Sequence, residues 1–244
     1  MTGSRRWKWW HVLLLVLGVG LAGLIAFVAA VYVSLIGGVD EIFRGDPPSE
    51  DDPQVVSAQQ DAAGSLTESA GPLVQHVLGT HSGARLVAQG LRRPRCTQGQ
   101  HNWKVDDDFD LVCDLEHLSV VVVDDPAFRD QTLALHDRLL ADGWRDDGFS
   151  LVRVVTDYWD SPPRAGYSVD DLPEGRYADS GRVHRLRVDW VESDSGPDRI
   201  AYFPEEVDLR DMRGARVTPT EVVRMVPESG HAIVLAESTE YFRQ

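Results

Sequence analysis

The sequence of 244 residues lacks the short motifs by which several large enzyme classes are recognised. It contains no nucleophile elbow, no H-E-x-x-H zinc motif, no phosphate-binding loop and no G-x-G-x-x-G turn. Its eight histidines are scattered, and none stands at metal-ligand spacing from another. No internal repeat is present, which argues against solenoids and propellers. We therefore predict no cofactor, no metal site and no catalytic residue.

Cysteine is almost absent, since Cys96 and Cys113 are the only two in the chain. Two thiols at this separation lack the close-paired spacing of zinc sites. An even number of cysteines in an oxidising compartment is typical of a disulfide. We predict a Cys96–Cys113 disulfide, which would close a loop of 18 residues. The chain-entropy model gives such a loop about 3 kcal/mol of stabilisation.

A complete calcium loop is also missing. The carboxylates of Asp106, Asp108 and Asp110 alternate as in the first half of a calcium-binding loop. Such a loop needs glycine at its sixth position and an acid at its twelfth, where this sequence has Leu111 and His117. We therefore interpret this stretch as a solvated acidic hairpin loop.

No acidic residue occurs before Asp40. Three of the 24 Lys and Arg residues precede that point and all 39 Asp and Glu residues follow, so the remainder carries a formal charge of −18. A surface of that sign repels DNA, RNA and anionic lipid headgroups. We therefore exclude nucleic acid as a partner.

One long apolar segment stands out, because Val12 to Val39 contains no Asp, Glu, Lys or Arg over 28 residues. About 20 apolar residues suffice to span a bilayer as a helix, which pairs its own backbone polar groups in lipid. At about 1.5 Å per residue, this segment reaches about 42 Å. We predict a transmembrane helix over residues 12–39, in contact with membrane lipid.

The charges beside this segment predict its orientation. Arg5, Arg6 and Lys8 precede it, and Asp40 is the first charge after it. The positive-inside bias then places a cytoplasmic tail at residues 1–11 and everything beyond residue 40 outside the cell membrane. The alternative is a signal peptide cleaved near Ala30. We favour an uncleaved signal-anchor, because the apolar run exceeds the usual 7–15 residues of a signal sequence.

Small residues recur at every fourth position of the predicted transmembrane helix and therefore share one face. This stripe comprises Gly18, Ala22, Ala26, Ala30 and Ser34. Such stripes allow two helices to approach closely in lipid, which would make a homodimer. The alternative is an alanine-rich helix that simply faces lipid.

Residues 40–71 are predicted to form a flexible stalk, because they are rich in Ala, Gln, Ser, Asp and Pro and contain few large apolar side chains. The folded domain is then expected over residues 72–244. Leu73, Val74 and Val77 fit the apolar face of a short helix at its start.

The domain is predicted to be α+β, with a mixed sheet and a few packed helices. Residues 111–123 are predicted to form a central strand, followed by a helix that starts at Asp124 and that Gly143 ends. A strand over residues 150–156 would complete a parallel strand–helix–strand unit. Further strands are expected at residues 186–190 and 232–236, with a short capped helix from Thr218.

The segment 157–181 is predicted to be a long irregular loop, and loops of that length in a compact domain are usually functional or disordered. Its aromatic and cationic side chains could stack on a sugar ring or a peptide. The candidate ligand-binding residues are Tyr158, Trp159, Arg164 and Tyr167. Alternatively, these side chains cover one end of the core.

Taken as a sequence, the chain favours a non-catalytic module: a single-pass membrane protein whose outer domain binds an envelope protein or a wall polymer. Two alternatives stay open, an envelope enzyme with a carboxylate-based site and a structural subunit of a membrane complex. A concave pocket lined by carboxylates of shifted pKa would favour the enzyme.

Overall fold

The computed structural model describes residues 14, 23–28, 31–32, 48–101, 104–124, 127–160, 174–181, 183–192, 207–227 and 230–244. The chain forms two compact units, Met1–Pro47 and Pro48–Gln244. In the first unit the described residues are helical, and among the described residues of the chain no helix is long and apolar enough to span a bilayer. The helix over residues 12–39 stays a prediction. Of the small-residue stripe, only Ala26 is described.

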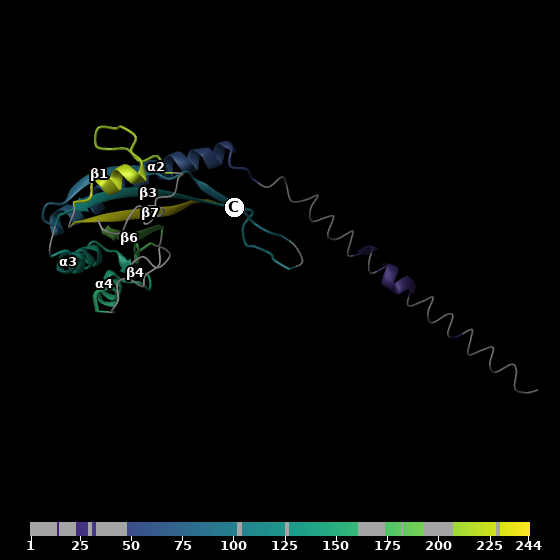
Figure 1. Cartoon of the computed structure of the whole chain (residues 1–244). Coiled ribbons are helices and arrows are strands. Elements are labelled where there is room, and N and C mark those ends of the chain that lie inside the picture. The colour runs from purple at the N-terminus through teal and green to yellow at the C-terminus, as the bar shows by residue number, and fades with distance from the viewer. Residues whose placement is uncertain are drawn as a thin grey trace, which may run out of the picture. The chain divides into compact units, whose positions relative to one another are not determined.

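The second unit is built on an antiparallel β-sheet (Figure 1). Neighbouring strands follow the order β1-β3-β7-β6-β5-β4, and β2 also pairs with β3. Every pairing between the named strands is antiparallel, so the sheet is not the mixed one that the sequence suggested. The strands are β1 (Arg85–Leu91), β2 (Arg95–Gln98), β3 (Leu111–Val123), β4 (Arg145–Asp146), β5 (Glu174–Ala178), β6 (His184–Glu192) and β7 (His231–Arg243).

The two longest strands, β3 and β7, pair along their length at the centre of the sheet. The predicted central strand is confirmed with both its bounds, residues 111 and 123. The predicted burial of residues 232–236 in the last strand is also confirmed. Both strands combine β-branched residues with burial on both faces, as a covered central strand requires.

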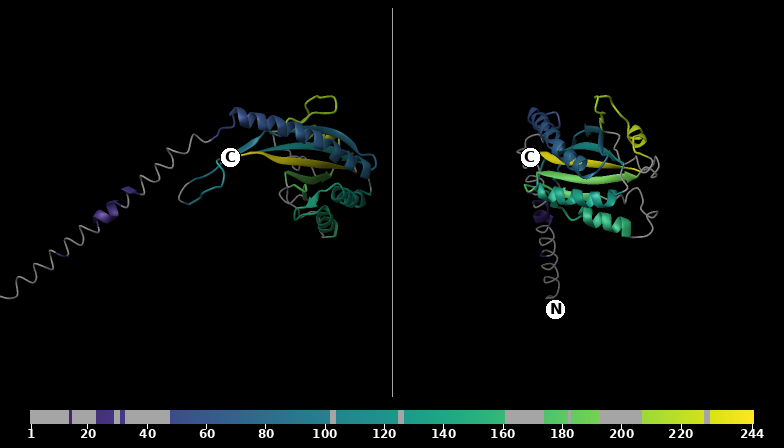
Figure 2. Two further views of the ribbon diagram at one scale, coloured as in Figure 1. Left: turned by 180° about the vertical axis from the view of Figure 1, so that it is seen from behind. Right: turned by 90° about the vertical axis from the view of Figure 1, so that its left-hand side faces the viewer.

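Helical segments cover both faces of the sheet. Alternate residues of β3 point to opposite faces, and they belong to two separate hydrophobic clusters. One cluster joins the sheet to α2 (Pro53–Thr80), α3 (Phe128–Ala141) and α4 (Leu151–Asp160). The other joins it to residues 207–226, which contain α5 (Pro219–Arg224). Figure 2 shows α2 and α5 on opposite sides of the strands.

The predicted stalk differs most from the structure. From Pro53 onward its residues belong to α2, which packs on β3 and β7. Gly64, Gly71 and Pro72 lie inside this helix and weaken its intrinsic propensity, which is why the sequence did not suggest it. Tertiary burial of one face compensates. The buried residues of α2 are Val55, Ala62, Leu66, Ala70, Leu73, Val74 and Val77.

The strand predicted at residues 150–156 is wrong, because α4 occupies this position. Leu151 and Val155, four residues apart, are both buried against the core, so helical spacing overrides the β-branched composition. The parallel strand–helix–strand unit is therefore also wrong. The amide of Leu151 donates to the hydroxyl of Tyr177 on β5, at 3.1 Å.

Three predicted helix boundaries can be compared with the structure. The capping box before α5 is confirmed, since the amide of Thr218 donates to the carboxylate of Glu221 and the amide of Glu221 donates to the hydroxyl of Thr218. The helix after β3 begins at Phe128, later than Asp124. Gly143, with φ 95°, follows its end as predicted.

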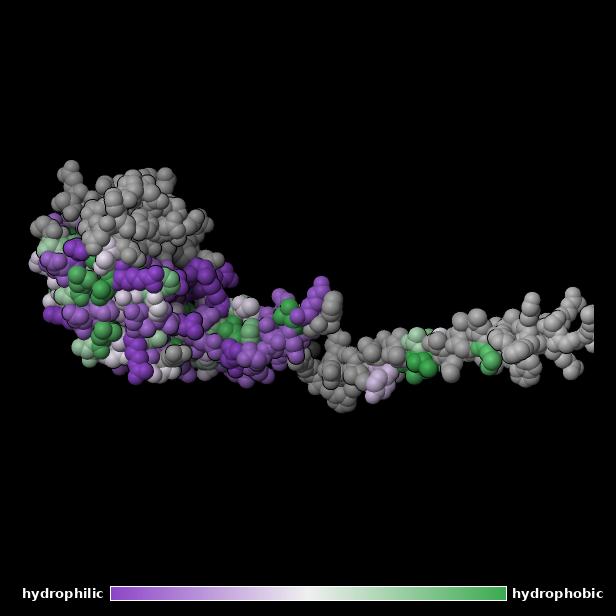
Figure 3. Space-filling model, turned by 90° about the horizontal axis from the view of Figure 1, so that it is seen from below, coloured by the Kyte–Doolittle hydropathy of each residue, from purple (hydrophilic) through white to green (hydrophobic). Residues whose placement is uncertain are grey.

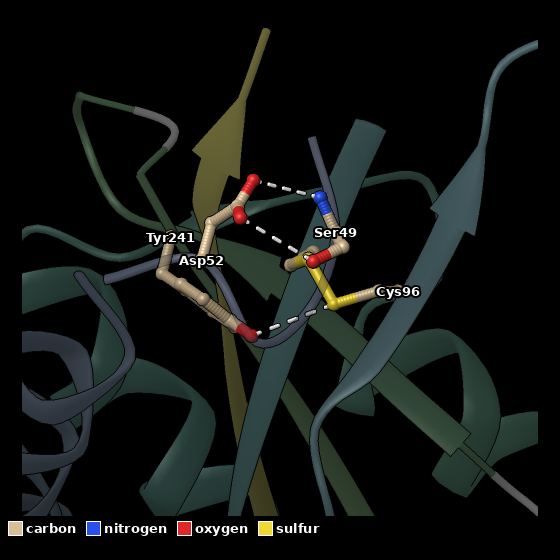
Figure 4. The surroundings of a disulfide bond; sticks show 5 residues. Ser49, Asp52, Cys96 and Tyr241 are labelled. Atoms are coloured by element: carbon tan, nitrogen blue, oxygen red, sulfur yellow. Dashed lines mark hydrogen bonds between the residues drawn. A yellow bond between two sulfur atoms is a disulfide. The ribbon is translucent and has the colours of Figure 1, made fainter. Parts of the chain in front are cut away.

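The predicted disulfide is confirmed, and Cys96 on β2 lies opposite Cys113 on β3 in the strand register. It covalently links a short edge strand to the centre of the sheet. Val55, at the start of α2, packs in the same cluster as Cys113. Figure 4 shows the hydroxyl of Tyr241, 3.6 Å from the sulfur of Cys96, and the Ser49–Asp52 turn beside it.

Candidate functional site

The predicted ligand-binding residues are not tested by the structure. Tyr158 and Trp159 lie in α4 with only their backbone described, and Arg164 and Tyr167 lie outside the described residues. The candidate sites of the described residues are formed by other side chains. Two hollows beside α2 share one row of buried polar residues.

This row lies on β3 and β7, on the face that α2 covers. His117 and Glu237 are opposite each other in the β3–β7 register and are only 4% and 2% exposed. Side chains directly opposite in an antiparallel pair are close neighbours. Ser119 and Thr239 extend the row and are also buried. A row of polar groups in this position is costly unless its members find partners.

Glu237 has two partners from other elements. The hydroxyl of Ser69, on α2, donates to Oε2 of Glu237 at 2.8 Å, and Nδ1 of His184, on β6, lies 2.9 Å from Oε1. Burial raises the pKa of the Glu237 carboxyl, while the Ser69 hydrogen bond and His184 act in the opposite direction. The negative charge of Asp179 raises this pKa further.

Beside this carboxylate lies a hollow of about 300 Å³, here called the Glu237 hollow. It is lined by Ser69, Pro72, Leu73, Asp142, Gly143, Trp144, Asp179, Ser180, His184 and Glu237. Three of these residues are carboxylates, one of which has a raised pKa. A carboxyl group that keeps its proton toward neutral pH is suited to donate it in general acid catalysis.

The order of groups in this hollow differs from that of a nucleophilic triad. There the imidazole lies between the hydroxyl and the carboxylate, so that it removes the hydroxyl proton. Here the carboxylate of Glu237 lies between the hydroxyl of Ser69 and the imidazole of His184. The arrangement therefore positions the carboxyl group of Glu237 and does not activate the hydroxyl of Ser69 as a nucleophile.

A second cavity, a groove of about 460 Å³ between α2, β1 and residues 208–214, contains His117, and we call it the His117 groove. It is lined by Thr67 of α2, Gln89, Gly90 and Leu91 of β1, His117 of β3, and Asp208, Arg210, Asp211, Met212 and Gly214. Among the described residues His117 has no hydrogen-bond or ion-pair partner. Burial lowers the pKa of its imidazole to about 4, so the ring is neutral at physiological pH.

The outer wall of the groove is a hairpin that pairs with the edge of the sheet. The amide of Arg210 donates to the carbonyl of Gln89 at 2.8 Å, and the reverse bond is 3.0 Å long. A Cβ at Gly90 would lie 2.2 Å from the carbonyl oxygen of Asp208, so only glycine permits this approach. The guanidinium of Arg210 is held by Asp208 at 2.7 Å and by the carbonyl of Gly214 at 3.2 Å.

The opposite face of the sheet holds a network of charges. Glu116 lies 3.3 Å from Arg92 and 3.8 Å from Arg187, and Arg187 also contacts the buried Asp189 at 2.9 Å. Burial raises the pKa of the Glu116 carboxyl against the effect of Arg187. Each of these charges has a partner of opposite sign, so this network is suited to holding adjacent strands together.

The acidic loop between β2 and β3 agrees with the predicted hairpin loop. His101 lies 2.9 Å from both Asp106 and Asp110, and Arg243 contacts Asp108 at 2.6 Å. Within the described parts of the chain, no group of three or more His, Cys, Asp or Glu is arranged to hold a metal ion.

The sequence alone did not identify Ser69 and Glu237, the central residues of the Glu237 hollow. Ser69 lies within the predicted stalk, and Glu237 lies one residue beyond the apolar run of the last strand. A usable signal was present, because residues 233, 235 and 237 share one face of a strand. An acid at residue 237, on a strand face predicted to be buried, requires a partner.

Comparisons with known proteins do not assign either hollow. No protein family model matches the chain, and no curated protein or solved structure shows significant similarity to it.

The neutral imidazole of His117 predicts a dependence of stability on pH. Its pKa is about 4 in the folded chain and 6.5 when unperturbed. As the pH falls from 6.5 to 4, the unfolded chain binds a proton at this site and the folded chain does not. This shift makes folding less favourable by about 3 kcal/mol at the acidic end.

Urea unfolding of the full chain in detergent, at pH 7 and pH 4, should therefore differ between the wild type and His117→Gln. We expect the variant to lose about 3 kcal/mol less over this interval. Glu116 and Glu237 are present in both proteins, and their raised pKa values act in the opposite direction. Identical losses of unfolding free energy in the two proteins would show that His117 has the same pKa in the folded and the unfolded chain, which would contradict the prediction.

Proposed function

We propose that the chain is a single-pass membrane protein that displays an acidic α+β domain outside the cell membrane, where it binds an envelope protein or a wall polymer. The N-terminus lies in the cytoplasm, and residues 12–39 anchor the chain in lipid. The observation that carries the binding role is the His117 groove, whose buried imidazole has no partner among the described residues.

The disulfide supports the proposed location. Disulfides persist outside the cytoplasm and are rare in the reducing cytosol. Cys96 and Cys113 are adjacent across two strands and are both oxidised. The residues after Val39 carry a formal charge of −18, and the described surface in Figure 3 is largely hydrophilic. These features are typical of a domain that faces water.

The groove supports binding because it is preformed. Its floor comes from β1 and β3 and its walls come from α2 and the hairpin at residues 207–217, all parts of one folded unit. Ligand sites are usually concave, largely formed before binding, and carry a few polar groups among apolar ones. Leu91 and Met212 supply apolar surface here, and His117 and Gln89 supply polar groups.

The topology is testable in intact cells that express the full chain with a tag at either end. Protease added outside should remove the C-terminal tag and leave the N-terminal tag intact, because only the C-terminal domain is exposed. Mass spectrometry should find an uncleaved N-terminus. A protected C-terminal tag, or a mature chain that begins near Val31, would contradict the proposal.

The enzyme alternative is favoured by one observation, the Glu237 hollow. It is concave, contains three carboxylates and holds one carboxyl group with a raised pKa. Such a group in a hollow is a candidate general acid. In this alternative the proton donor is Glu237, and Ser69 and His184 position it.

This alternative predicts that the full chain releases soluble fragments from purified cell-wall material. Glu237→Gln should reduce that release at least a hundredfold, since general acid catalysis typically contributes about 10²–10⁴ in rate. Glu240→Gln provides a matched control, because Glu240 is an exposed acid on the same strand. Absence of release by the wild type would count against the enzyme and leave the binding module in place.

A further inference from the structure

The His117 groove presents a hydrogen-bonding group that the described residues leave unused. A neutral imidazole has one N–H donor and one nitrogen acceptor. The side chain is 4% exposed and has no partner among the described residues. Buried polar groups without a partner are costly, so a site of this kind is completed by water or by a ligand.

A second side chain in the groove has the same character. The side-chain amide of Gln89, on β1, also carries donors and an acceptor, and it has no hydrogen bond to another described residue. In the β1–β3 register Gln89 is opposite Ser119 and Leu91 is opposite His117, so Gln89 and His117 lie two residues apart along the same face of the sheet. Two donor–acceptor groups therefore lie along one side of the groove.

The charges of the groove favour a neutral ligand. The Arg210 guanidinium is already compensated by Asp208. The carboxylate of Asp211 accepts the backbone amides of Arg213 and Ala215. An anion would meet a domain of strongly negative charge, and among the described residues no group of three or more His, Cys, Asp or Glu is arranged to hold a metal cation.

We propose that the His117 groove binds a neutral sugar that carries an N-acetyl group, with the acetamido N–H and C=O paired to His117 and Gln89. A secondary amide supplies one donor and one acceptor, which is the complement of each of these side chains. Leu91 and Met212 provide apolar surface for the methyl group, and Thr67 is a further polar residue of the lining. This inference rests on the proposed binding function and names the ligand class of that groove.

The edge of the sheet distinguishes a sugar from a peptide. An extended peptide commonly binds by adding a strand to an open sheet edge. Here the part of the β1 edge that borders the groove, Gln89 to Leu91, is already hydrogen-bonded to residues 208–210 of the same chain. The groups left available in the groove are side chains, which suit the scattered hydroxyl and amide groups of a sugar.

The test is calorimetric titration of the full chain in detergent micelles with the β-1,4-linked trimer of N-acetylglucosamine. Cellotriose has the same linkage and lacks the acetamido groups, so we expect it to bind at least tenfold more weakly. Equal affinity for the two sugars, or no binding of the acetylated trimer, would overturn the proposal. An acetylated peptide that binds in place of the trimer would overturn it in favour of a peptide.

Matched variants localise the binding. Thr67→Trp should weaken binding at least tenfold by filling the groove, whereas Thr156→Trp should change it less than twofold. Both threonines are exposed on helices and donate to the carbonyl four residues earlier. Gln89→Ala should also weaken binding tenfold, and Gln98→Ala on β2 should not. Circular dichroism checks that each variant is folded.

The outcomes separate this inference from the proposed function. If the tag experiment places the domain outside and the trimer does not bind, the ligand class is wrong and the displayed module stands. If the trimer binds equally well to the wild type and Thr67→Trp, the sugar site lies elsewhere. If the trimer binds but the C-terminus is cytoplasmic, the sugar-binding role of the groove stands and the proposed location is wrong.

Discussion

The packing of α2 on β3 and β7 is the interaction on which the rest of this domain depends. Leu66, Leu73 and Val77 are each almost completely buried, and burial of such a side chain contributes about 1.5–3 kcal/mol. This contribution offsets the weak helix propensity that Gly64 and Pro72 impose. Without α2, the polar row of β3 and β7 would be open to water and neither hollow would have its wall.

The same packing explains why polar groups lie in the interior. Because α2 crosses the row, Glu237 is removed from water and is held by Ser69 and His184, while His117 has no partner among the described residues and lines the groove. One helix therefore produces two environments. In one, burial raises the pKa of a carboxyl that already has partners, and in the other it leaves a neutral imidazole facing a groove.

The sequence predicted those elements whose structure depends mainly on neighbouring residues in the chain. Residues 111–123, the Thr218 capping box and the Cys96–Cys113 disulfide were predictable because periodicity, cap chemistry and cysteine count specify them without reference to distant residues. The α2 and α4 helices were not, because burial against distant strands overrides their composition. The candidate site could not be predicted for the same reason. The residues of the His117 groove come from α2, from the two strands β1 and β3, and from the edge hairpin at residues 207–217.

Hydrogen exchange of the full chain in detergent tests the central claim most directly. If α2 packs on the sheet, the backbone amides of residues 66–77 will exchange with protection comparable to that of residues 111–123 and 231–243, because they open only with the core. Exchange of residues 66–71 at the rate of an unstructured chain, beside a protected sheet, would contradict the account. Both hollows would then lose the helix that forms their common wall.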